Sequence, residues 1–170
     1  MRKKTMQNTV LSAMFMCLGL TLPFLTGQIE FLGEALLPMH LPIILCGIIC
    51  GWKYGLVVGF ATPLLRMYIF GMPQMPDALS MAFELATYAT VAGSLYYLWG
   101  KRNIFGLFGS LTVAIIVGRI VRVIVKAFVV GMGFKAFSYQ VFVVDGFLYG
   151  LPGIITQFIL IPVIVRTFNK

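Results

Sequence analysis

The sequence has little charge: 11% of its 170 residues are Asp, Glu, Lys or Arg, whereas 60% are hydrophobic. A soluble domain carries about 25% charged residues. The mean hydropathy of +0.98 points the same way. The composition excludes an ordinary soluble protein and indicates an integral membrane protein lying almost entirely within the bilayer. No polar stretch is long enough to link a second domain, so residues 1–170 are interpreted as one transmembrane domain.

The sequence also lacks the residue groups on which most catalytic and metal sites depend. It has one histidine, and its three cysteines (Cys17, Cys46 and Cys50) show no zinc-ligand spacing. The phosphate-binding pattern G-x-x-x-x-G-K-[ST] is absent, so the chain cannot hydrolyse ATP by that route. We therefore expect a non-catalytic protein without a metal or cofactor, in which the cysteines are small packing residues. The net charge is +8, but the chain has no soluble basic face that could bind nucleic acid. Most of the excess positive charge is attributed to residues that set the membrane topology.

What the sequence does contain is a series of hydrophobic runs, which predict a compact all-α bundle of six transmembrane helices. Strand-like alternation is absent, and helices satisfy their own backbone in lipid. The predicted helices cover about residues 9–25, 36–50, 54–70, 78–99, 104–130 and 147–165. A perpendicular span needs about 20 residues, so the second run either begins earlier or is partly buried in protein. The short polar turn Trp52–Tyr54 is expected to join the second and third helices.

The loops between these runs differ in charge, which predicts the topology. One set of loops and both termini hold eight positive residues and no negative ones: Arg2, Lys3, Lys4, Lys53, Lys101, Arg102, Arg166 and Lys170. The alternate loops hold one positive and four negative residues: Lys135, Glu30, Glu34, Asp77 and Asp145. The positive-inside rule then places both termini in the cytoplasm.

Small residues recur where helices are expected to pack closely. Gly47/Gly51 and Gly55/Gly59 are interpreted as two close-packing pairs that let the second and third helices approach. Ala82, Ala86, Ala89 and Gly93 are expected to do the same for the fourth helix.

A few polar groups lie inside the hydrophobic runs, where they are costly and therefore mark candidate functional sites. His40, Arg66 and Glu84 are expected towards the outer ends of their helices. Arg119, Arg122 and Lys126 follow i, i+3, i+7 spacing and share one helical face. Two alternatives stay open: Glu84 pairs with Arg122 or Lys126 only to hold the bundle together, or Arg119 faces the cytoplasmic half while Lys126 reaches outward. The residues expected to bind substrate are Glu84, His40, Arg66, Tyr88, Arg122, Lys126, Asp145 and Tyr149.

The layout and the series LLPMHLPIILCGIICGWKYGLVVGF, FGMP and MAFELATY resemble the S components of energy-coupling factor (ECF) transporters. The resemblance covers nearly the whole chain and is strongest to a branch that includes predicted carriers of pyridoxine, hydroxymethylpyrimidine or pantothenate. It implies capture of a vitamin on the outer side. It also implies two kinds of partner, a transmembrane coupling protein and two cytosolic ATPase subunits. The family packs an Ala-x-x-x-Ala motif of its first helix on the coupling protein. Here the matching residues are Ala13 and Cys17, so the second position departs from the pattern.

The sequence therefore predicts a substrate-binding subunit for a hydroxymethylpyrimidine or pyridoxine type of ring, with pantothenate as the alternative. A carboxylate such as Glu84 can accept from a ring N–H or an amine, while aromatic side chains hold the ring faces. The cations of residues 119–126 favour a carboxylate-bearing ligand instead. A different class of function is a self-sufficient carrier or channel working as a homo-oligomer, but no internal inverted repeat supports it. A membrane-embedded enzyme would need a reactive constellation that the sequence lacks.

Overall fold

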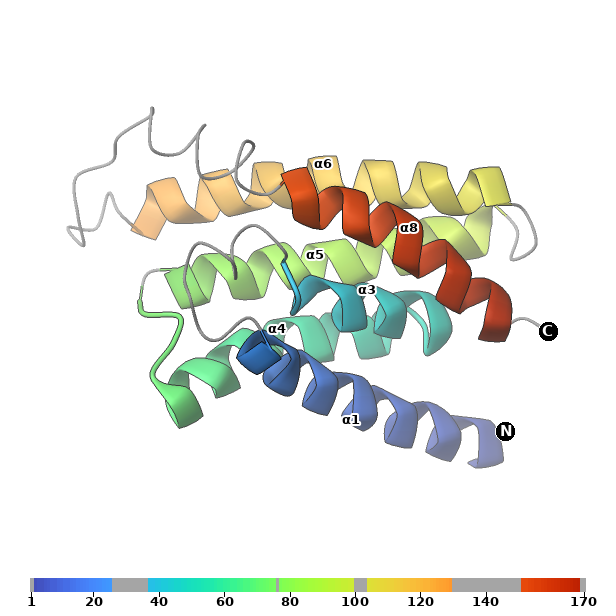
Figure 1. The fold of residues 1–170 in the computed structure, drawn as a ribbon, viewed down its shortest axis with the longest axis horizontal. Coiled ribbons are helices and arrows are strands. Elements are labelled where there is room, and N and C mark those ends of the chain that lie inside the picture. The colour runs from blue at the N-terminus through green and yellow to red at the C-terminus, as the bar shows by residue number, and fades with distance from the viewer. Residues whose placement is uncertain (1, 26–36, 76, 100–103, 130–150, 169–170) are drawn as a thin grey trace.

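The structure is a computed structural model, and it describes residues 2–25, 37–75, 77–99, 104–129 and 151–168. These residues form an all-α bundle, as predicted (Figure 1). Its helices are α1 (Arg2–Leu25), α3 (His40–Ile49), α4 (Trp52–Phe70), α5 (Asp77–Leu98), α6 (Ile104–Val129) and α8 (Leu151–Phe168).

Helix α5 is the centre of the bundle. It packs against α3, α4 and α6, while α1 packs on α3 and α4, and α8 packs on α3 and α6 (Figure 1). The N-terminal end of α1 and the C-terminal end of α8 lie at one end of the bundle. The α3–α4 turn lies at that same end, whereas α5 begins at the opposite end. This arrangement agrees with the alternation of loops on which the predicted topology rests.

By length and composition alone, two of the described stretches are sufficient to cross a membrane, Lys3–Phe24 and Ile104–Val129. Two others, His40–Ile49 and Pro152–Thr167, are apolar but shorter. Helix α3 is the short one expected from the sequence, and eight of its residues are buried. Its backbone is therefore enclosed by other helices, which is the second of the two explanations offered for its length.

The helix ends differ from the predicted ones at several places. Helix α1 begins at Arg2 rather than near residue 9, because polar residues such as Lys3 and Gln7 are good helix formers even though they are not apolar. Helix α3 begins at His40 rather than near residue 36, since Leu37 has a left-handed φ of 47° and its carbonyl accepts from the His40 N–H at 3.0 Å. Helix α8 is described from Leu151 to Phe168 and extends past the predicted end at 165.

The predicted turn between the second and third helices was placed wrongly. Trp52, Lys53 and Tyr54 form the first turn of α4. The chain instead reverses at Cys50–Gly51, where Gly51 has φ 104° and a Cβ would meet nothing within 4 Å. Gly51 is therefore a turn glycine and does not take part in the close packing expected of it.

The other glycines bring α3, α4 and α5 into close contact. A Cβ on Gly55 would lie 2.6 Å from the Cα of Gly47 and 2.8 Å from the Cβ of Ala89. A Cβ on Gly59 would lie 2.8 Å from the backbone of α5, and one on Gly93 would meet the Gly47 carbonyl. The small residues therefore join α3, α4 and α5, with α5 as the common partner, and Ala89 and Gly93 take part in this close packing as expected from the sequence.

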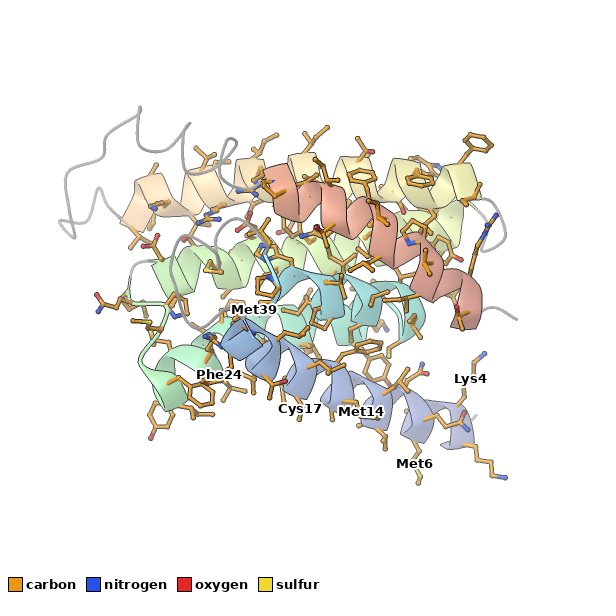
Figure 2. The ribbon with its side chains drawn as sticks, in the orientation of Figure 1. Lys4, Met6, Met14, Cys17, Phe24 and Met39 are labelled. Carbon is orange, nitrogen blue, oxygen red and sulfur yellow. The ribbon has the colours of Figure 1, made fainter. Side chains whose placement is uncertain are left out.

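Two polar contacts attach α1 to the α3–α4 hairpin, one near each end of α1. Towards its N-terminus, the Asn8 side chain donates to the Cys50 carbonyl at 3.1 Å. Towards its C-terminus, Arg66 of α4 donates to the Leu20 carbonyl at 2.9 Å. The opposite side of α1 carries exposed residues, among them Met6, Met14 and Cys17, which point away from the other helices (Figure 2).

Candidate functional site

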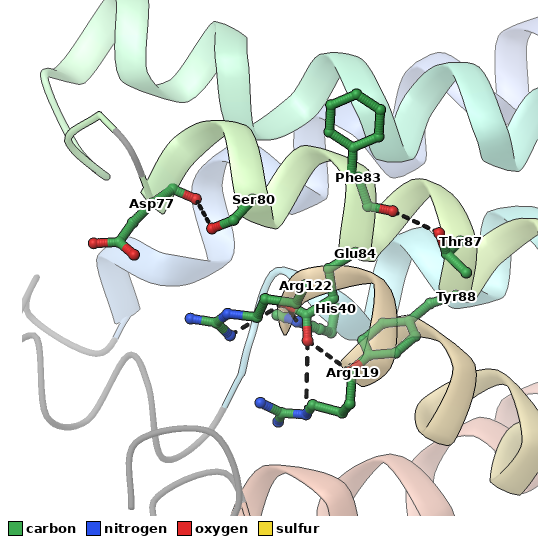
Figure 3. Close-up of polar contacts among 9 residues, drawn as sticks. All are labelled: His40, Asp77, Ser80, Phe83, Glu84, Thr87, Tyr88, Arg119 and Arg122. Carbon is green, nitrogen blue, oxygen red and sulfur yellow. Dashed lines mark hydrogen bonds and ion pairs between the residues drawn. The ribbon is translucent and has the colours of Figure 1, made fainter. Parts of the chain in front are cut away.

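Glu84 lies in the interior of the bundle, seven residues after the start of α5 at Asp77. At 1.5 Å per residue this is about 10 Å from the helix end. Its side chain is fully buried. Tyr88 follows one turn later on the same face, and its hydroxyl donates to Oε1 of Glu84 at 2.7 Å (Figure 3). A buried carboxylate requires such partners, and Tyr88 provides one from within the same helix.

Helix α6 contributes two arginines to this carboxylate. Arg122 donates from Nη1 to Oε2 of Glu84 at 3.1 Å, and Nε of Arg119 lies 3.6 Å from Oε1 (Figure 3). The two arginines are three residues apart, which places them on one face of α6 towards α5. Arg119 thus lies at the Glu84 carboxylate, although the sequence left open that it faces the cytoplasmic half. Sequence analysis did not include it among the binding residues; its spacing relative to Arg122 was the signal for it.

His40 approaches the same carboxylate from the first residue of α3. Its Nε2 lies 3.9 Å from Oε2 of Glu84, and its ring centroid is 5.5 Å from that of Tyr88. The side chain is fully buried. Residues from three helices therefore meet at Glu84, and the sequence separates them by as many as 82 positions, from His40 to Arg122. We call His40, Glu84, Tyr88, Arg119 and Arg122 the Glu84 cluster.

Gly118 is a further residue on which the cluster depends, and sequence analysis missed it. A Cβ on Gly118 would collide with the ring of Tyr88, at Cε1 and Cδ1. The missing side chain lets the Tyr88 ring lie directly against α6. Only its place beside Arg119 in the sequence could have drawn attention to it.

Several buried polar atoms of the cluster have no hydrogen-bond partner in the part of the chain that the structure describes. They are Nδ1 and Nε2 of His40 and Nε and Nη2 of Arg119. Nε2 of Gln157, on α8, is in the same condition. An unmet buried donor or acceptor costs about 1–3 kcal/mol, so such atoms normally have a partner such as a ligand or water. The cluster therefore has unused hydrogen-bonding capacity for a small polar molecule.

Lys126 does not share the carboxylate with the arginines. Its Nζ lies 2.8 Å from Oδ1 of Asp77, the first residue of α5, and both side chains are partly exposed. Asp77 lies seven residues before Glu84, and Lys126 lies four residues after Arg122. The Asp77–Lys126 ion pair therefore joins α5 and α6 in addition to the pairs of Glu84 with Arg119 and Arg122. Of the two internal pairs considered from the sequence, the structure has Glu84–Arg122 and replaces Glu84–Lys126 by Asp77–Lys126.

Arg66 makes its contacts elsewhere. Besides the bond to the Leu20 carbonyl, its guanidinium lies 5.2 Å from the ring centroid of Phe24 and 5.9 Å from that of Phe70. The contacts with Leu20 and Phe24 hold α1 against α4, whereas Phe70 lies on α4 itself. Within the part of the chain that the structure describes, Arg66 has no contact with the Glu84 carboxylate.

The remaining expected site residues divide into two groups. Asp145 and Tyr149 lie outside the described residues. Ala13 and Cys17 are on the exposed side of α1, so the face that carries them is free of contacts with the other described helices. Among the described residues no group of three or more His, Cys, Asp or Glu side chains is arranged to hold a metal ion.

A comparison with protein-family models decides the family. The model described as "ECF transporter, substrate-specific component" matches residues 6–165, which is nearly the whole chain. The chain belongs to this family. The resemblance noted in the sequence is thereby confirmed at the level of the family. The searches of curated proteins and of solved structures gave no match.

Membership of this family gives the protein its general role. It is a substrate-specific component of an ECF transporter, a membrane protein that binds a substrate for import. The family implies association with an ECF module, which has coupling and ATPase subunits, and a small molecule as the substrate. The absence of an ATP-binding pattern from the sequence fits this division of labour.

Proposed function

We propose that this S component captures a small water-soluble vitamin or vitamin precursor at the Glu84 cluster. The observation that carries the proposal is the meeting of five polar side chains from α3, α5 and α6 in the interior, with four hydrogen-bonding atoms left unmet. Polar groups in the interior of a membrane bundle are costly and are kept where function needs them. Internal pairing alone would leave no unmet atoms, so it accounts for only part of this arrangement.

A nitrogen heterocycle is one candidate substrate. Glu84 is oriented by Tyr88 and Arg122, and each of its oxygens can accept a further hydrogen bond. It could therefore accept from a ring N–H or an amine, while His40 offers a nitrogen and a ring face. A hydroxymethylpyrimidine or pyridoxine type of ring has these groups.

Pantothenate is the second candidate, and one observation favours it. The unmet donors of Arg119 require an acceptor, and a carboxylate is the best acceptor for a guanidinium. The two candidates therefore differ in which side of the cluster they satisfy, the Glu84 side or the Arg119 side.

The proposed transport direction follows from the topology. The eight positive residues on the predicted inner side place both termini in the cytoplasm. The ends of α1 and α8 share one end of the bundle, and Asp77 at the start of α5 is at the other (Figure 1). The Glu84 cluster would then lie in the outer half of a multi-pass protein of the bacterial plasma membrane, where substrate enters.

We further propose that the exposed face of α1 packs on the coupling protein through Ala13 and Cys17. These residues are small, and both are exposed in the isolated chain. Small residues let two membrane helices approach closely. Two cytosolic ATPase subunits would complete the module and supply the energy for release.

Mass spectrometry of the small molecule retained after mild detergent purification tests the proposed substrate. We expect a vitamin or precursor in the wild-type sample and less of it per folded protein in Glu84→Gln. Co-purification tests the class of protein. A coupling protein and ATPases should accompany the chain, whereas transport by the reconstituted chain alone as a homo-oligomer would support the rival carrier or channel.

A further inference from the structure

The charges of the Glu84 cluster are unbalanced. Two arginines, Arg119 and Arg122, face one carboxylate, that of Glu84, and His40 supplies no negative charge. The Glu84 side chain is fully buried and that of Arg119 is 6% exposed. A charge in such a place is costly unless it is paired. Within the cluster, one positive charge therefore remains without a carboxylate of its own.

The contacts identify which arginine this is. Glu84 accepts hydrogen bonds from Tyr88 at 2.7 Å and from Arg122 at 3.1 Å. Arg119 approaches the carboxylate only through Nε, at 3.6 Å, and that distance is too long for a hydrogen bond. Among the residues that the structure describes, neither Nε nor Nη2 of Arg119 has a hydrogen-bond partner, although both atoms are buried.

The two unmet atoms belong to one edge of the guanidinium. Nε–H and one N–H of Nη2 point in the same direction and form the fork that binds both oxygens of a carboxylate. A single hydroxyl or carbonyl oxygen would have to accept both bonds at one atom, whereas a carboxylate offers one oxygen to each N–H and a negative charge as well. The unmet atoms thus match an anionic group with two oxygens better than a neutral one.

We propose that Arg119 determines substrate specificity by binding a carboxylate of the substrate, so that the substrate is a small monoanion. This inference rests on the proposed function, because it places the substrate at the Glu84 cluster. Arg122 has a separate part: it neutralises Glu84 and keeps that carboxylate from repelling the substrate's own. The substrate adds the negative charge that the cluster lacks, and the buried arginine is then fully paired.

A rival explanation is that Arg119 only stabilises the bundle by closing on Glu84. A shift of about 0.4 Å, from 3.6 Å, would bring Nε into hydrogen-bond range, since such bonds extend to about 3.2 Å. The rival predicts that removing Arg119 lowers stability and leaves unchanged the preference between an acid and the corresponding alcohol. Our proposal predicts that this preference changes.

Two matched pairs of probes separate the proposals: pantothenate with panthenol, and 4-pyridoxate with pyridoxine. Within each pair a carboxylate replaces an alcohol and most of the molecule is the same. The full-length protein, freed of retained molecules by exchange in detergent, is titrated with each of the four compounds. For at least one pair, we expect the acid to bind wild-type protein about tenfold more tightly than the alcohol, or better, as for a charge-assisted pair of hydrogen bonds.

Arg119→Gln should reduce the ratio of the affinity for the acid to the affinity for the alcohol to about one. Arg166→Gln is the control, because Arg166 is an exposed arginine near the C-terminal end of α8. The Arg166→Gln variant carries the same Arg-to-Gln change and should keep the wild-type ratio of acid to alcohol affinity. Arg119→Lys keeps the charge but loses the fork, and an intermediate ratio is expected.

Each outcome decides one of the proposals. If neither acid binds wild-type protein more tightly than its alcohol, or if the acid preference survives Arg119→Gln, the role of Arg119 is overturned and the proposed function stands. Binding of none of the four compounds would contradict the proposed function in its pyridoxine and pantothenate forms, and the monoanion proposal would fail with it. An acid preference that disappears only in the Arg119 variants would support both.

Discussion

The hydroxyl of Tyr88 and the carboxylate of Glu84, one helical turn apart on α5, are joined by a hydrogen bond of 2.7 Å in the interior of the bundle. Tyr88 donates to Oε1, which leaves Oε2 directed at Arg122 of α6. The ring of Tyr88 fits there because the neighbouring position on α6 is Gly118. The orientation of the Glu84 carboxylate is thus set in part by a residue of the same helix, α5, in addition to the residues of α3 and α6.

Tyr88→Phe should lower stability and weaken substrate binding. It removes the hydrogen bond to Glu84 without changing the shape of the ring, and a buried bond to a charged group contributes about 1.5–3 kcal/mol. Thermal unfolding and titration with the retained substrate measure the two effects. Tyr68→Phe is the control: Tyr68 is 87% exposed, and the same substitution there should change neither quantity. Wild-type affinity in Tyr88→Phe would show that the substrate does not depend on the orientation of Glu84.

Glu84→Gln should weaken substrate binding by about 1–3 kcal/mol, the scale of a charge-assisted hydrogen bond. It should also lower the melting temperature, because Arg122 loses its buried partner. Asp77→Asn provides the comparison, since it removes the carboxylate of the more exposed ion pair with Lys126, and such pairs contribute about 0–1 kcal/mol. If the dissociation constant per folded molecule of Glu84→Gln is that of the wild type, Glu84 serves only to hold the bundle together.

Gly118→Ala should weaken binding although residue 118 has no side chain to contact a substrate. The added Cβ would collide with the Tyr88 ring, and overpacking of this kind costs about 1–3 kcal/mol. A displaced ring loses its bond to Glu84. Gly109→Ala on the same helix is the matched control: its Cβ would lie 2.8 Å from Cζ3 of Trp99, a half-exposed ring that can move aside. Equal losses of affinity in the two variants would argue against a specific effect on Tyr88.

Ala13→Trp should abolish assembly with the coupling protein and ATPases while the isolated chain still binds substrate. A large ring on the exposed face of α1 would prevent the close approach of a partner helix, and the Glu84 cluster is built from other helices. Val57→Trp, on an exposed position of α4, is the matched control and should assemble normally. Normal uptake by Ala13→Trp would exclude a close contact at that residue, and loss of both binding and assembly would indicate misfolding.

The topology prediction is tested with single cysteines in a cysteine-free background. Cysteines at Lys4, Lys101 and Lys170 should be protected from an impermeant thiol reagent in intact cells, and one at Gln74 should be labelled. The reason is the charge asymmetry, eight positive residues and no negative ones on the side of the termini. Labelling of the Lys101 position from outside would reverse the orientation and move the Glu84 cluster to the inner half.

The sequence predicted the helices better than it predicted their ends. Hydropathy shows which residues prefer lipid, so it located the core of each described helix, but it does not report where backbone hydrogen bonding stops. The first turn of α4 was therefore predicted as a loop because Trp52, Lys53 and Tyr54 are polar or amphipathic. The backbone of Gly51, which no hydropathy value describes, made the turn.

The sequence predicted part of the site. The cost of a charge in lipid singled out His40, Glu84 and Arg122, and Tyr88 was among the aromatic residues expected to bind substrate. Arg66 and Lys126 were singled out by the same argument, but the structure gives them partners on α1 and at Asp77. A cost argument identifies residues that need a partner, and it cannot name the partner.

The sequence by itself determined that this is an all-α membrane protein of the ECF substrate-specific family, because composition, run lengths and motifs are properties of the chain alone. Only the tertiary structure decided which charges meet. Glu84 pairs with Arg122, Lys126 pairs with Asp77, and Arg119 keeps an unmet edge. These choices depend on the rotation and offset of α5 against α6, which are set by close contacts such as that of Gly118 with Tyr88. Contacts between residues 30 to 49 positions apart are fixed by packing, and no local pattern in the sequence records them.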